Sequence, residues 1–270
     1  MIGVFDSGYG GLTVLKEIIR QLPDYDYCYL GDNARTPYGS RSFDTVYRYT
    51  LQAVQHLFAQ GCRLIIVACN TASAKALRTI QQRDLPLIDA QRRVLGVIRP
   101  SAEAIGEYTT THHVGILGTI GTVQSGSYPM EIAKLHPQIK VFQEACPIWV
   151  PLVECNEHLH SGTDYFVKQH IDRLLQQSSE IDTIVLACTH YPLLLEKIRR
   201  FTPSHIRIIA QGTIVAGSLC DYLRRHPEME QTLAKSGKRI FQTSDAPELF
   251  DNFASIFFGE AVKSERAVIG

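Results

Sequence analysis

The stretch that decides the fold is Leu64-Ile65-Ile66-Val67-Ala68-Cys69-Asn70-Thr71. It opens with four apolar residues, three of them β-branched, a pattern typical of a short buried strand. Residues 72–77 then have the composition of a helix start, and Asn70 or Thr71 is the predicted N-cap. This order predicts that the Cys69 thiol lies at the carboxyl end of a strand and close to a helix N-terminus. Open parallel sheets bind ligands at this position, and the helix end favours a thiolate there.

The same pattern occurs again at Ile184-Val185-Leu186-Ala187-Cys188-Thr189-His190-Tyr191-Pro192. An earlier pair of segments also corresponds, because Gly3-Val4-Phe5-Asp6-Ser7 aligns with Gly115-Ile116-Leu117-Gly118-Thr119. Each of these segments is a predicted strand that ends in a hydroxyl residue. We therefore predict two similar α/β units related by a pseudo-twofold, with both cysteines facing one cleft. The alternative is chance, since parallel α/β proteins often repeat strand and turn patterns.

Strands and helices alternate along the rest of the chain, which predicts parallel sheets with helices on both faces. The alternation includes a short predicted strand at Pro86-Leu87-Ile88 and one helix over about residues 123–135. The strand pattern restarts after Leu95. We therefore expect a first domain of residues 1–95 with 208–270 and a second of residues 96–207.

The composition excludes several classes of protein. The 27 Lys and Arg residues equal the 27 Asp and Glu residues in number, so no nucleic-acid or membrane-surface partner is indicated. No apolar run is long enough to cross a bilayer, and the chain begins in a predicted strand, so we expect no cleavable leader. Seven cysteines without a C-x-x-C pair argue against a disulfide framework and predict a reducing, cytoplasmic location.

Two candidate cofactor motifs are incomplete. Gly8-x-Gly10-Gly11 begins like a dinucleotide fingerprint, but Thr13 stands at the third glycine position. The segment from Cys155 to His160 contains residue types that bind metals, yet no second cluster completes a tetrahedral site. We therefore expect no cofactor and no metal.

Several blocks of the sequence resemble glutamate racemase, and they occur in that family's order. They are Phe5-Asp6-Ser7-Gly8-x-Gly10-Gly11-Leu12-Thr13, Tyr29-Leu30-Gly31-Asp32, Pro37-Tyr38-Gly39, Ala68-Cys69-Asn70-Thr71-Ala72, Val150-Pro151-Leu152-Val153-Glu154 and Cys188-Thr189-His190-Tyr191-Pro192. The Ala-Cys-Asn-Thr block alone would indicate only the wider aspartate/glutamate racemase superfamily. The full resemblance implies a cofactor-independent enzyme that interconverts L- and D-glutamate and supplies D-glutamate for peptidoglycan. We also expect a homodimer.

The chain departs from the family pattern at two places. Asp89–Val94 looks like extra sequence between the first and second units. Ala210-Gln211-Gly212 stands where Asp-Ser-Gly is usual, which puts a contact in the cleft in doubt.

The resemblance also implies roles for individual residues. Cys69 and Cys188 would be the two acid/base groups, with Asp6 beside the first thiol and His190 beside the second. Glu154 matches a family carboxylate near His190. The positions that match substrate-binding residues are Asp6, Ser7, Tyr38, Gly39, Asn70, Thr71, Thr119, Thr122, Thr189 and His190.

Simpler interpretations stand beside these roles. Asp6 and His190 could be helix caps, Glu154 a solvated charge at a helix end, and Tyr38 part of the packing of a loop. The five other cysteines are expected to be small buried apolar residues: Cys28, Cys62, Cys146, Cys155 and Cys220.

Paired thiols suit the inversion of an α-carbon, because one group must remove a proton while another delivers a proton to the opposite face. Unperturbed thiols, with a pKa of about 8.5, titrate near neutral pH, so one can begin as thiolate and the other as thiol. Two other functions remain open: a racemase for aspartate or another small acid, and a non-catalytic module that binds amino acids.

Overall fold

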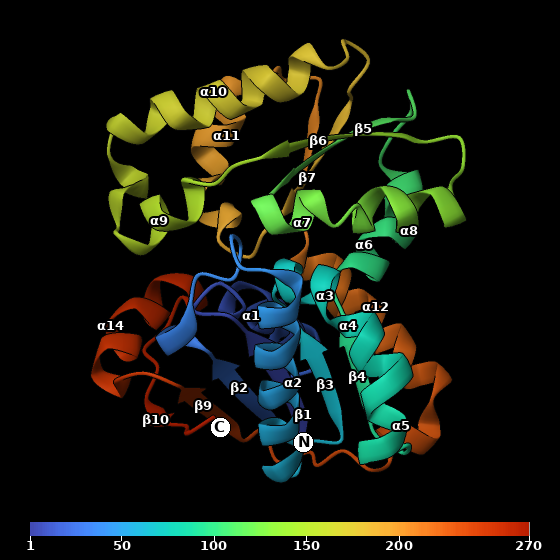
Figure 1. Ribbon diagram of the computed structural model, residues 1–270, viewed down its shortest axis with the longest axis vertical. Coiled ribbons are helices and arrows are strands. Elements are labelled where there is room, and N and C mark those ends of the chain that lie inside the picture. The colour runs from blue at the N-terminus through green and yellow to red at the C-terminus, as the bar shows by residue number, and fades with distance from the viewer. Residues whose placement is uncertain (270) are drawn as a thin grey trace.

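The computed structural model describes residues 1–269, which form a six-stranded and a four-stranded parallel sheet. The two sheets lie in separate units, one above the other in Figure 1. The first sheet has the order β10-β9-β2-β1-β3-β4 and comprises β1 (Ile2–Asp6), β2 (Tyr27–Gly31), β3 (Leu64–Val67), β4 (Arg93–Gly96), β9 (Arg239–Thr243) and β10 (Ser264–Arg266). The second has the order β6-β5-β7-β8 and comprises β5 (His113–Gly118), β6 (Lys140–Ala145), β7 (Thr183–Ala187) and β8 (Arg207–Ala210).

The two sheets repeat the same arrangement, because β2-β1-β3-β4 and β6-β5-β7-β8 are the same order of chain segments. The register repeats as well. Gly3 pairs with Ile65 and Gly115 pairs with Ile184, and in both units the cysteine follows four residues after that partner. The prediction of two similar parallel-sheet α/β units, each carrying one of the two cysteines, is confirmed.

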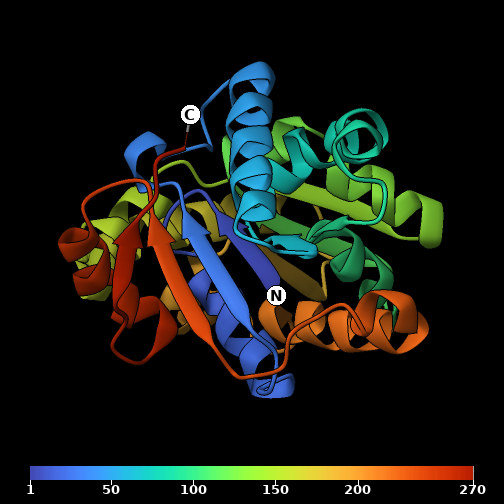
Figure 2. The same ribbon diagram turned by 90° about the horizontal axis from the view of Figure 1, so that it is seen from below.

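The helices of the first unit cover both faces of its sheet. They are α1 (Leu12–Gln21), α2 (Phe43–Ala59), α3 (Asn70–Lys75), α4 (Leu77–Thr79), α5 (Leu85–Ile88), α12 (Gly212–Arg225), α13 (Pro227–Glu230) and α14 (Pro247–Phe258). Successive side chains of a strand point to opposite faces. Val4 therefore lies in the same buried cluster as Leu15 of α1, whereas Phe5 lies in the cluster that contains Val54 of α2. Figure 2 shows α1 and α2 on opposite sides of the sheet.

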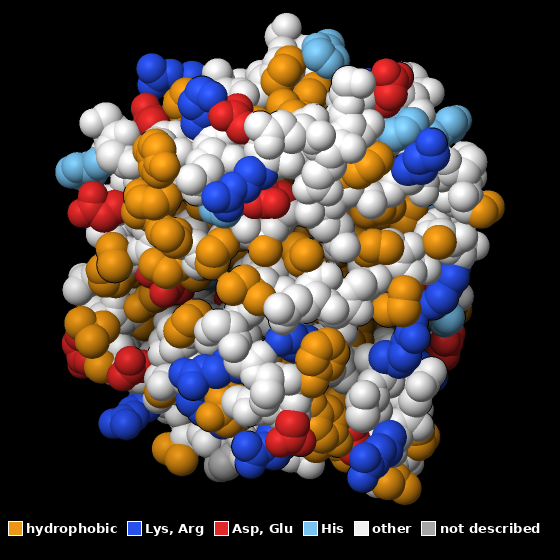
Figure 3. Space-filling model, turned by 45° about the horizontal axis from the view of Figure 1, so that its top comes forward, with side chains coloured by type: hydrophobic (Ala, Val, Ile, Leu, Met, Phe, Trp, Pro, Cys, Tyr) orange, Lys and Arg blue, Asp and Glu red, His pale blue; other side chains and the backbone are white. Residues whose placement is uncertain are grey.

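The second unit contains α6 (Ile98–Ala104), α7 (Ile120–Gln124), α8 (Ser127–Leu135), α9 (Trp149–Glu154), α10 (Gly162–Gln176) and α11 (Leu195–Phe201). Short 3₁₀ segments lie at Asn33–Arg35, Ile105–Glu107, Glu157–Leu159 and Tyr191–Leu194, and a π-helical segment lies at Ile80–Asp84. In the space-filling view, hydrophobic side chains form a band across the middle of the face shown (Figure 3). No helix within residues 1–269 has the length and apolar character needed to span a membrane.

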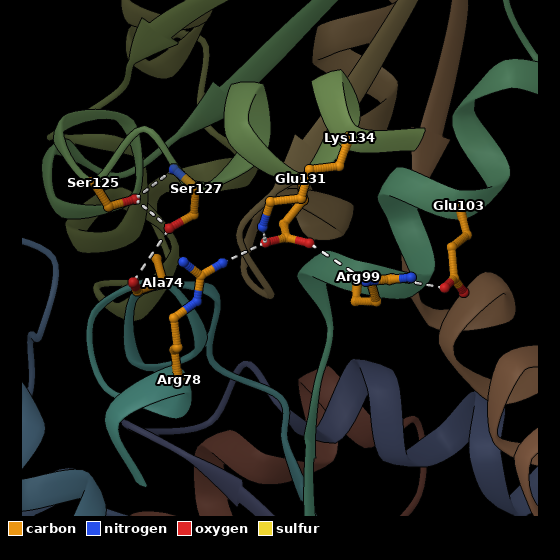
Figure 4. Close-up of polar contacts among 8 residues, drawn as sticks. All are labelled: Ala74, Arg78, Arg99, Glu103, Ser125, Ser127, Glu131 and Lys134. Atoms are coloured by element: carbon orange, nitrogen blue, oxygen red, sulfur yellow. Dashed lines mark hydrogen bonds and ion pairs between the residues drawn. The ribbon is translucent and has the colours of Figure 1, made fainter. Parts of the chain in front are cut away.

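Polar contacts on the surface join helices of the two units (Figure 4). Arg78 of α4 forms an ion pair with Glu131 of α8 at 2.7 Å, and Arg99 of α6 lies 3.7 Å from the same carboxylate. The Ser127 hydroxyl donates to the carbonyl of Ala74 at 3.2 Å. Because Arg78 and Arg99 are exposed, these ion pairs contribute little to the free energy of unfolding. The predicted domain boundaries near residues 95 and 208 stay predictions.

Two predictions about secondary structure are wrong. Residues 86–88 belong to α5 rather than to a strand, because Pro86 occupies the first turn of that helix and the Leu87 side chain is 85% exposed. The strand of this region is β4, which begins at Arg93. The last two residues of the supposed extra segment Asp89–Val94 therefore pair with β3. The helix expected over residues 123–135 is interrupted at Gly126, whose positive φ of 63° separates α7 from α8.

Stability measurements test this correction. We expect Val94→Ala to lower the free energy of unfolding by about 2 kcal/mol, because Val94 is buried in β4 and the change leaves a cavity. Leu87→Ser should change it by less than about 0.5 kcal/mol, because the side chain is already in water. Urea unfolding followed by circular dichroism measures both values. The reverse order of the two effects would place the buried strand at residues 86–88.

Candidate active site

A cavity of about 80 Å³ lies where the carboxyl ends of strands from both sheets meet. The residues of its lining that the sequence predicted are Ser7, Tyr38, Gly39, Cys69, Asn70, Thr71, Thr119, Cys188, Thr189 and His190. Three predicted residues, Asp6, Thr122 and Glu154, contact members of this lining without belonging to it. The cavity thus brings together both cysteines and the polar segments that follow five different strands.

The Cys69 thiol is held at the start of α3. Its sulfur accepts a hydrogen bond from the Ala72 backbone N–H at 3.5 Å, so Cys69 is the N-cap of α3 and the prediction of Asn70 or Thr71 is wrong. The thiol also donates to the Ser7 hydroxyl at 3.5 Å. Burial and the charge of Asp6 raise the pKa of Cys69 to about 12, although the bonds to Ser7 and Ala72 oppose the rise. In the free protein this sulfur therefore carries its proton at neutral pH.

The Asp6 carboxyl is fully buried at the end of β1. It accepts hydrogen bonds from the Gly8 backbone N–H at 3.0 Å and from the Thr189 hydroxyl at 3.3 Å. Burial raises the pKa of Asp6, while the charge of His190 and these hydrogen bonds lower it, and the net shift is upward. Asp6 does not cap α1, whose N-cap is Gly11 without a side-chain hydrogen bond, and it instead links the first unit to the segment that follows Cys188.

The second thiol has a different neighbour, the His190 ring. Nδ1 of His190 lies 4.0 Å from the Cys188 sulfur, and its Nε2 lies 3.0 Å from a carboxylate oxygen of Glu154. Burial disfavours the charged ring, but the hydrogen bonds to Cys188 and Glu154 outweigh it and raise the pKa of His190 to about 10. His190 is therefore charged at neutral pH. Glu154 is the last residue of α9 and faces the ring rather than open water.

Gly10 allows the two units to meet at this site. A Cβ atom on Gly10 would lie 2.2 Å from the Thr189 hydroxyl and 2.5 Å from Nδ1 of His190, so no larger residue fits without displacing them. The Thr13 hydroxyl donates to the Thr189 carbonyl at 3.0 Å in the same region. In the sequence, Gly8-x-Gly10-Gly11 resembled an incomplete dinucleotide fingerprint and formed part of one family block, and neither pattern predicted this role. The adjacent glycines Gly10 and Gly11 were the feature of the sequence that could have predicted a close approach here.

Hydroxyl groups join the units across the cavity. The Thr71 and Thr119 hydroxyls are 2.8 Å apart, and Thr119 lies 3.1 Å from the Thr122 hydroxyl. Thr119 is the N-cap of α7 and accepts from the Thr122 backbone N–H at 3.2 Å. The Gly39 carbonyl accepts from the Gly121 N–H at 2.8 Å, which ties the loop after β2 to α7.

Two further predicted residues have their polar atoms engaged within the protein. The Tyr38 hydroxyl donates to Asp32, and burial raises the pKa of Tyr38 far above neutrality, so this hydroxyl stays protonated. The Asn70 amide forms hydrogen bonds with Tyr128 and with Gln211, the residue at the departure from the family pattern.

The remaining cysteines differ in exposure. Cys28, Cys62 and Cys146 are buried as expected, whereas Cys155 is exposed and Cys220 is partly exposed, so the expectation of burial is wrong for these two. Cys146 lines the cavity, and burial raises its pKa well above the ordinary value, which keeps the thiol protonated. In the described part of the chain, no group of three or more His, Cys, Asp or Glu side chains is placed to hold a metal ion.

Known proteins are similar to this chain in sequence and in fold. The sequence pattern of the family described as Asp/Glu/Hydantoin racemase matches residues 2–218. A glutamate racemase of Persephonella marina is 39% identical over 267 residues, covering 98% of this chain and 96% of the relative. The crystal structure of a glutamate racemase isoform from Bacillus anthracis superposes with a TM-score of 0.89 at 34% identity, covering 99% of this chain and 97% of that chain. A Francisella tularensis glutamate racemase, solved in complex with D-glutamate, superposes with a TM-score of 0.86 at 28% identity. The match covers 100% of this chain and 97% of that chain.

The relatives and solved structures match nearly the whole chain, and they confirm the resemblance to glutamate racemase. The two-sheet architecture with one cysteine in each unit agrees with them. The chain therefore belongs to the Asp/Glu/hydantoin racemase family.

Proposed function

We propose that this protein interconverts L- and D-glutamate without a cofactor, using Cys69 and Cys188 as acid/base groups on opposite sides of the α-carbon. The observation that carries the proposal is that both thiols line one cavity and follow equivalent strands of two different sheets. The choice of glutamate is supported by whole-length relatives that are glutamate racemases and by the Francisella tularensis complex with D-glutamate.

The surroundings of the two thiols suggest how the reaction begins. Cys69, with its pKa raised to about 12, is suited to deliver a proton. The charged His190 ring stabilises a thiolate on Cys188, which is suited to remove one. In the L-to-D direction, the Cys188 thiolate takes the α-proton and the Cys69 thiol protonates the opposite face. In the D-to-L direction the roles reverse: the buried Asp6 carboxylate, whose pKa is raised, accepts the Cys69 proton, the Cys69 thiolate takes the α-proton, and the Cys188 thiol protonates the opposite face.

The α-proton of an amino acid is much less acidic than a thiol, so the site must also stabilise the carbanion. Fixed hydrogen-bond donors in a cavity that excludes most water supply this stabilisation. The hydroxyls of Thr71, Thr119 and Thr189, together with Ser7 and the Asn70 amide, line the cavity and in this proposal hold the amino and carboxylate groups of the substrate. Tyr38 and Gly39 also line the cavity, whereas Thr122 lies outside the lining and hydrogen-bonds to Thr119.

The biological setting is part of the same proposal. D-glutamate would be supplied for peptidoglycan, the role that the family resemblance implies. A cytoplasmic location is supported by the cysteines, all of which are free. A homodimer is proposed on the resemblance alone.

Cysteine variants test the two-base mechanism. We expect Cys69→Ala and Cys188→Ala each to lower racemisation by at least about 100-fold in both directions, because each direction uses both thiols. Cys62→Ala and Cys220→Ala, at cysteines outside the cavity lining, are the controls and should remain active. Circular dichroism of L-glutamate, D-glutamate and L-aspartate solutions measures the turnover and the substrate preference.

Exchange in deuterated water then assigns each thiol to an enantiomer. Cys69→Ser should still exchange or eliminate the α-proton of L-glutamate but not that of D-glutamate. The opposite result would exchange the two assignments. Substantial racemisation by either alanine variant would contradict the mechanism itself.

The pH dependence tests the pair formed by His190 and Glu154. His190 keeps its proton up to about pH 10 in the folded protein, so its stabilising charge is fully present below pH 6.5 and is lost as the pH rises through about 10. Glu154→Gln removes the carboxylate that favours this charge. We expect the alkaline limb of kcat/KM to move down by about one pH unit. NMR titration of the His190 ring measures the shift directly.

The matched control for this change is Glu157→Gln, which alters an exposed carboxylate three residues further along the chain. It should leave the alkaline limb where it is in the unmodified protein. An unchanged limb in Glu154→Gln would show that Glu154 is a surface charge without influence on the site.

Gly10 provides a test of the contact between the units. Gly10→Ala places a methyl group where Thr189 and His190 now lie, and a displacement of this kind should lower kcat/KM by at least about 100-fold. Gly162→Ala is the control, because nothing lies within 4 Å of the added Cβ. Circular dichroism establishes that both variants are folded. A folded Gly10→Ala variant with full activity would show that the close contact is dispensable.

A further inference from the structure

Three buried side chains beside the cavity form a closed ring of hydrogen bonds. Asn70 Nδ2 donates to Gln211 Oε1 at 2.7 Å, and Gln211 Nε2 donates to the Tyr128 hydroxyl at 2.6 Å. The Tyr128 hydroxyl in turn donates to Asn70 Oδ1 at 2.7 Å. All three residues are at most 4% exposed, so water does not compete for these bonds. Each side chain in the ring therefore both donates and accepts.

The donor-to-acceptor direction of the hydrogen bonds in the ring is fixed by neighbouring residues that do not belong to it. The Ser101 hydroxyl donates its proton to the Val97 carbonyl at 2.9 Å, so its oxygen must accept from Gln211, which lies 2.6 Å away. The Gln211 atom on that side is therefore the nitrogen. It follows that the Gln211 oxygen faces Asn70 and receives the Asn70 N–H. A carbonyl of the backbone, which can only accept, thus determines how the Asn70 amide is turned.

The ring also connects elements of both units. Asn70 begins α3 of the first unit directly after Cys69, whereas Tyr128 belongs to α8 and Ser101 to α6. Gln211 lies between β8 and α12 and contacts all three. A serine in the usual Asp-Ser-Gly pattern has a single hydroxyl and could not form this set of bonds. The ring in this chain therefore depends on the amide of Gln211.

Asn70 lines the cavity, and the ring uses only one of its two amide hydrogens. An amide turned the other way would exchange a donor for an acceptor at the substrate. We infer that Gln211 is a positioning residue, which holds the Asn70 amide in one orientation and so fixes the hydrogen-bonding groups that this amide offers to the substrate. The inference rests on the proposed function, because it assigns Asn70 to the binding of glutamate.

Steady-state kinetics of ring variants test this inference. Gln211→Leu removes both polar groups at similar volume, and Tyr128→Phe removes the hydroxyl. We expect each to raise KM for glutamate by about 10-fold, with a smaller change in kcat. The double variant should be no worse than the more impaired single variant, because the ring is already broken. Gln21→Leu is the matched control, since that partly exposed amide lies outside the ring, and its KM should be unchanged.

The other outcomes have separate meanings. A purely structural role would lower the melting temperature of Gln211→Leu and leave KM unchanged, or would give additive effects in the double variant, and either result overturns the inference. If Gln211→Leu fails to fold, the KM of Tyr128→Phe for glutamate tests the inference alone. An unchanged KM in that variant then overturns it. If the unmodified protein does not turn over glutamate at all, the proposed function has failed and the inference falls with it.

Discussion

The site depends on the close approach of two turns, one after β1 and one after β7. Gly10 permits this approach, because any side chain at that position would occupy the space of Thr189 and His190. The same approach brings the Thr189 hydroxyl to the buried Asp6 carboxyl. Each unit thus completes the surroundings of the other unit's cysteine region. Neither half of the chain contains an intact site alone, although each has its own sheet.

The repeated backbone carries unequal side chains. Cys69 and Cys188 occupy equivalent places in strand register, yet the first lies near a buried carboxyl and the second near a charged imidazole. A repeated fold supplies the opposed positions of two groups, and local substitutions then give each sulfur a different charged neighbour. In the proposed reaction this difference in surroundings lets one sulfur begin as a proton donor and the other as a proton acceptor.

Local patterns in the sequence were sufficient to predict the buried strands and the functional residues that directly follow them. The β-branched runs before Cys69 and Cys188 identified β3 and β7, and the repeat predicted that both cysteines face one cavity. The prediction of a strand at residues 86–88 was wrong, because a short apolar run does not reveal whether its side chains are buried. Leu87 is in fact largely exposed. Gln211 lies 141 residues from Asn70 in the chain. A hydrogen bond over that separation depends on how the two units dock, which no local pattern contains.

The unequal surroundings of the two thiols have a kinetic consequence. Enantiomers have equal free energies in water, so the equilibrium constant of a racemisation is unity. The Haldane relation then requires kcat/KM to be the same for both enantiomers in the unmodified protein and in every active variant. Any difference between the two sulfurs must therefore appear as parallel changes in kcat and KM. An enantiomer with the higher kcat must also have a KM that is higher in the same proportion.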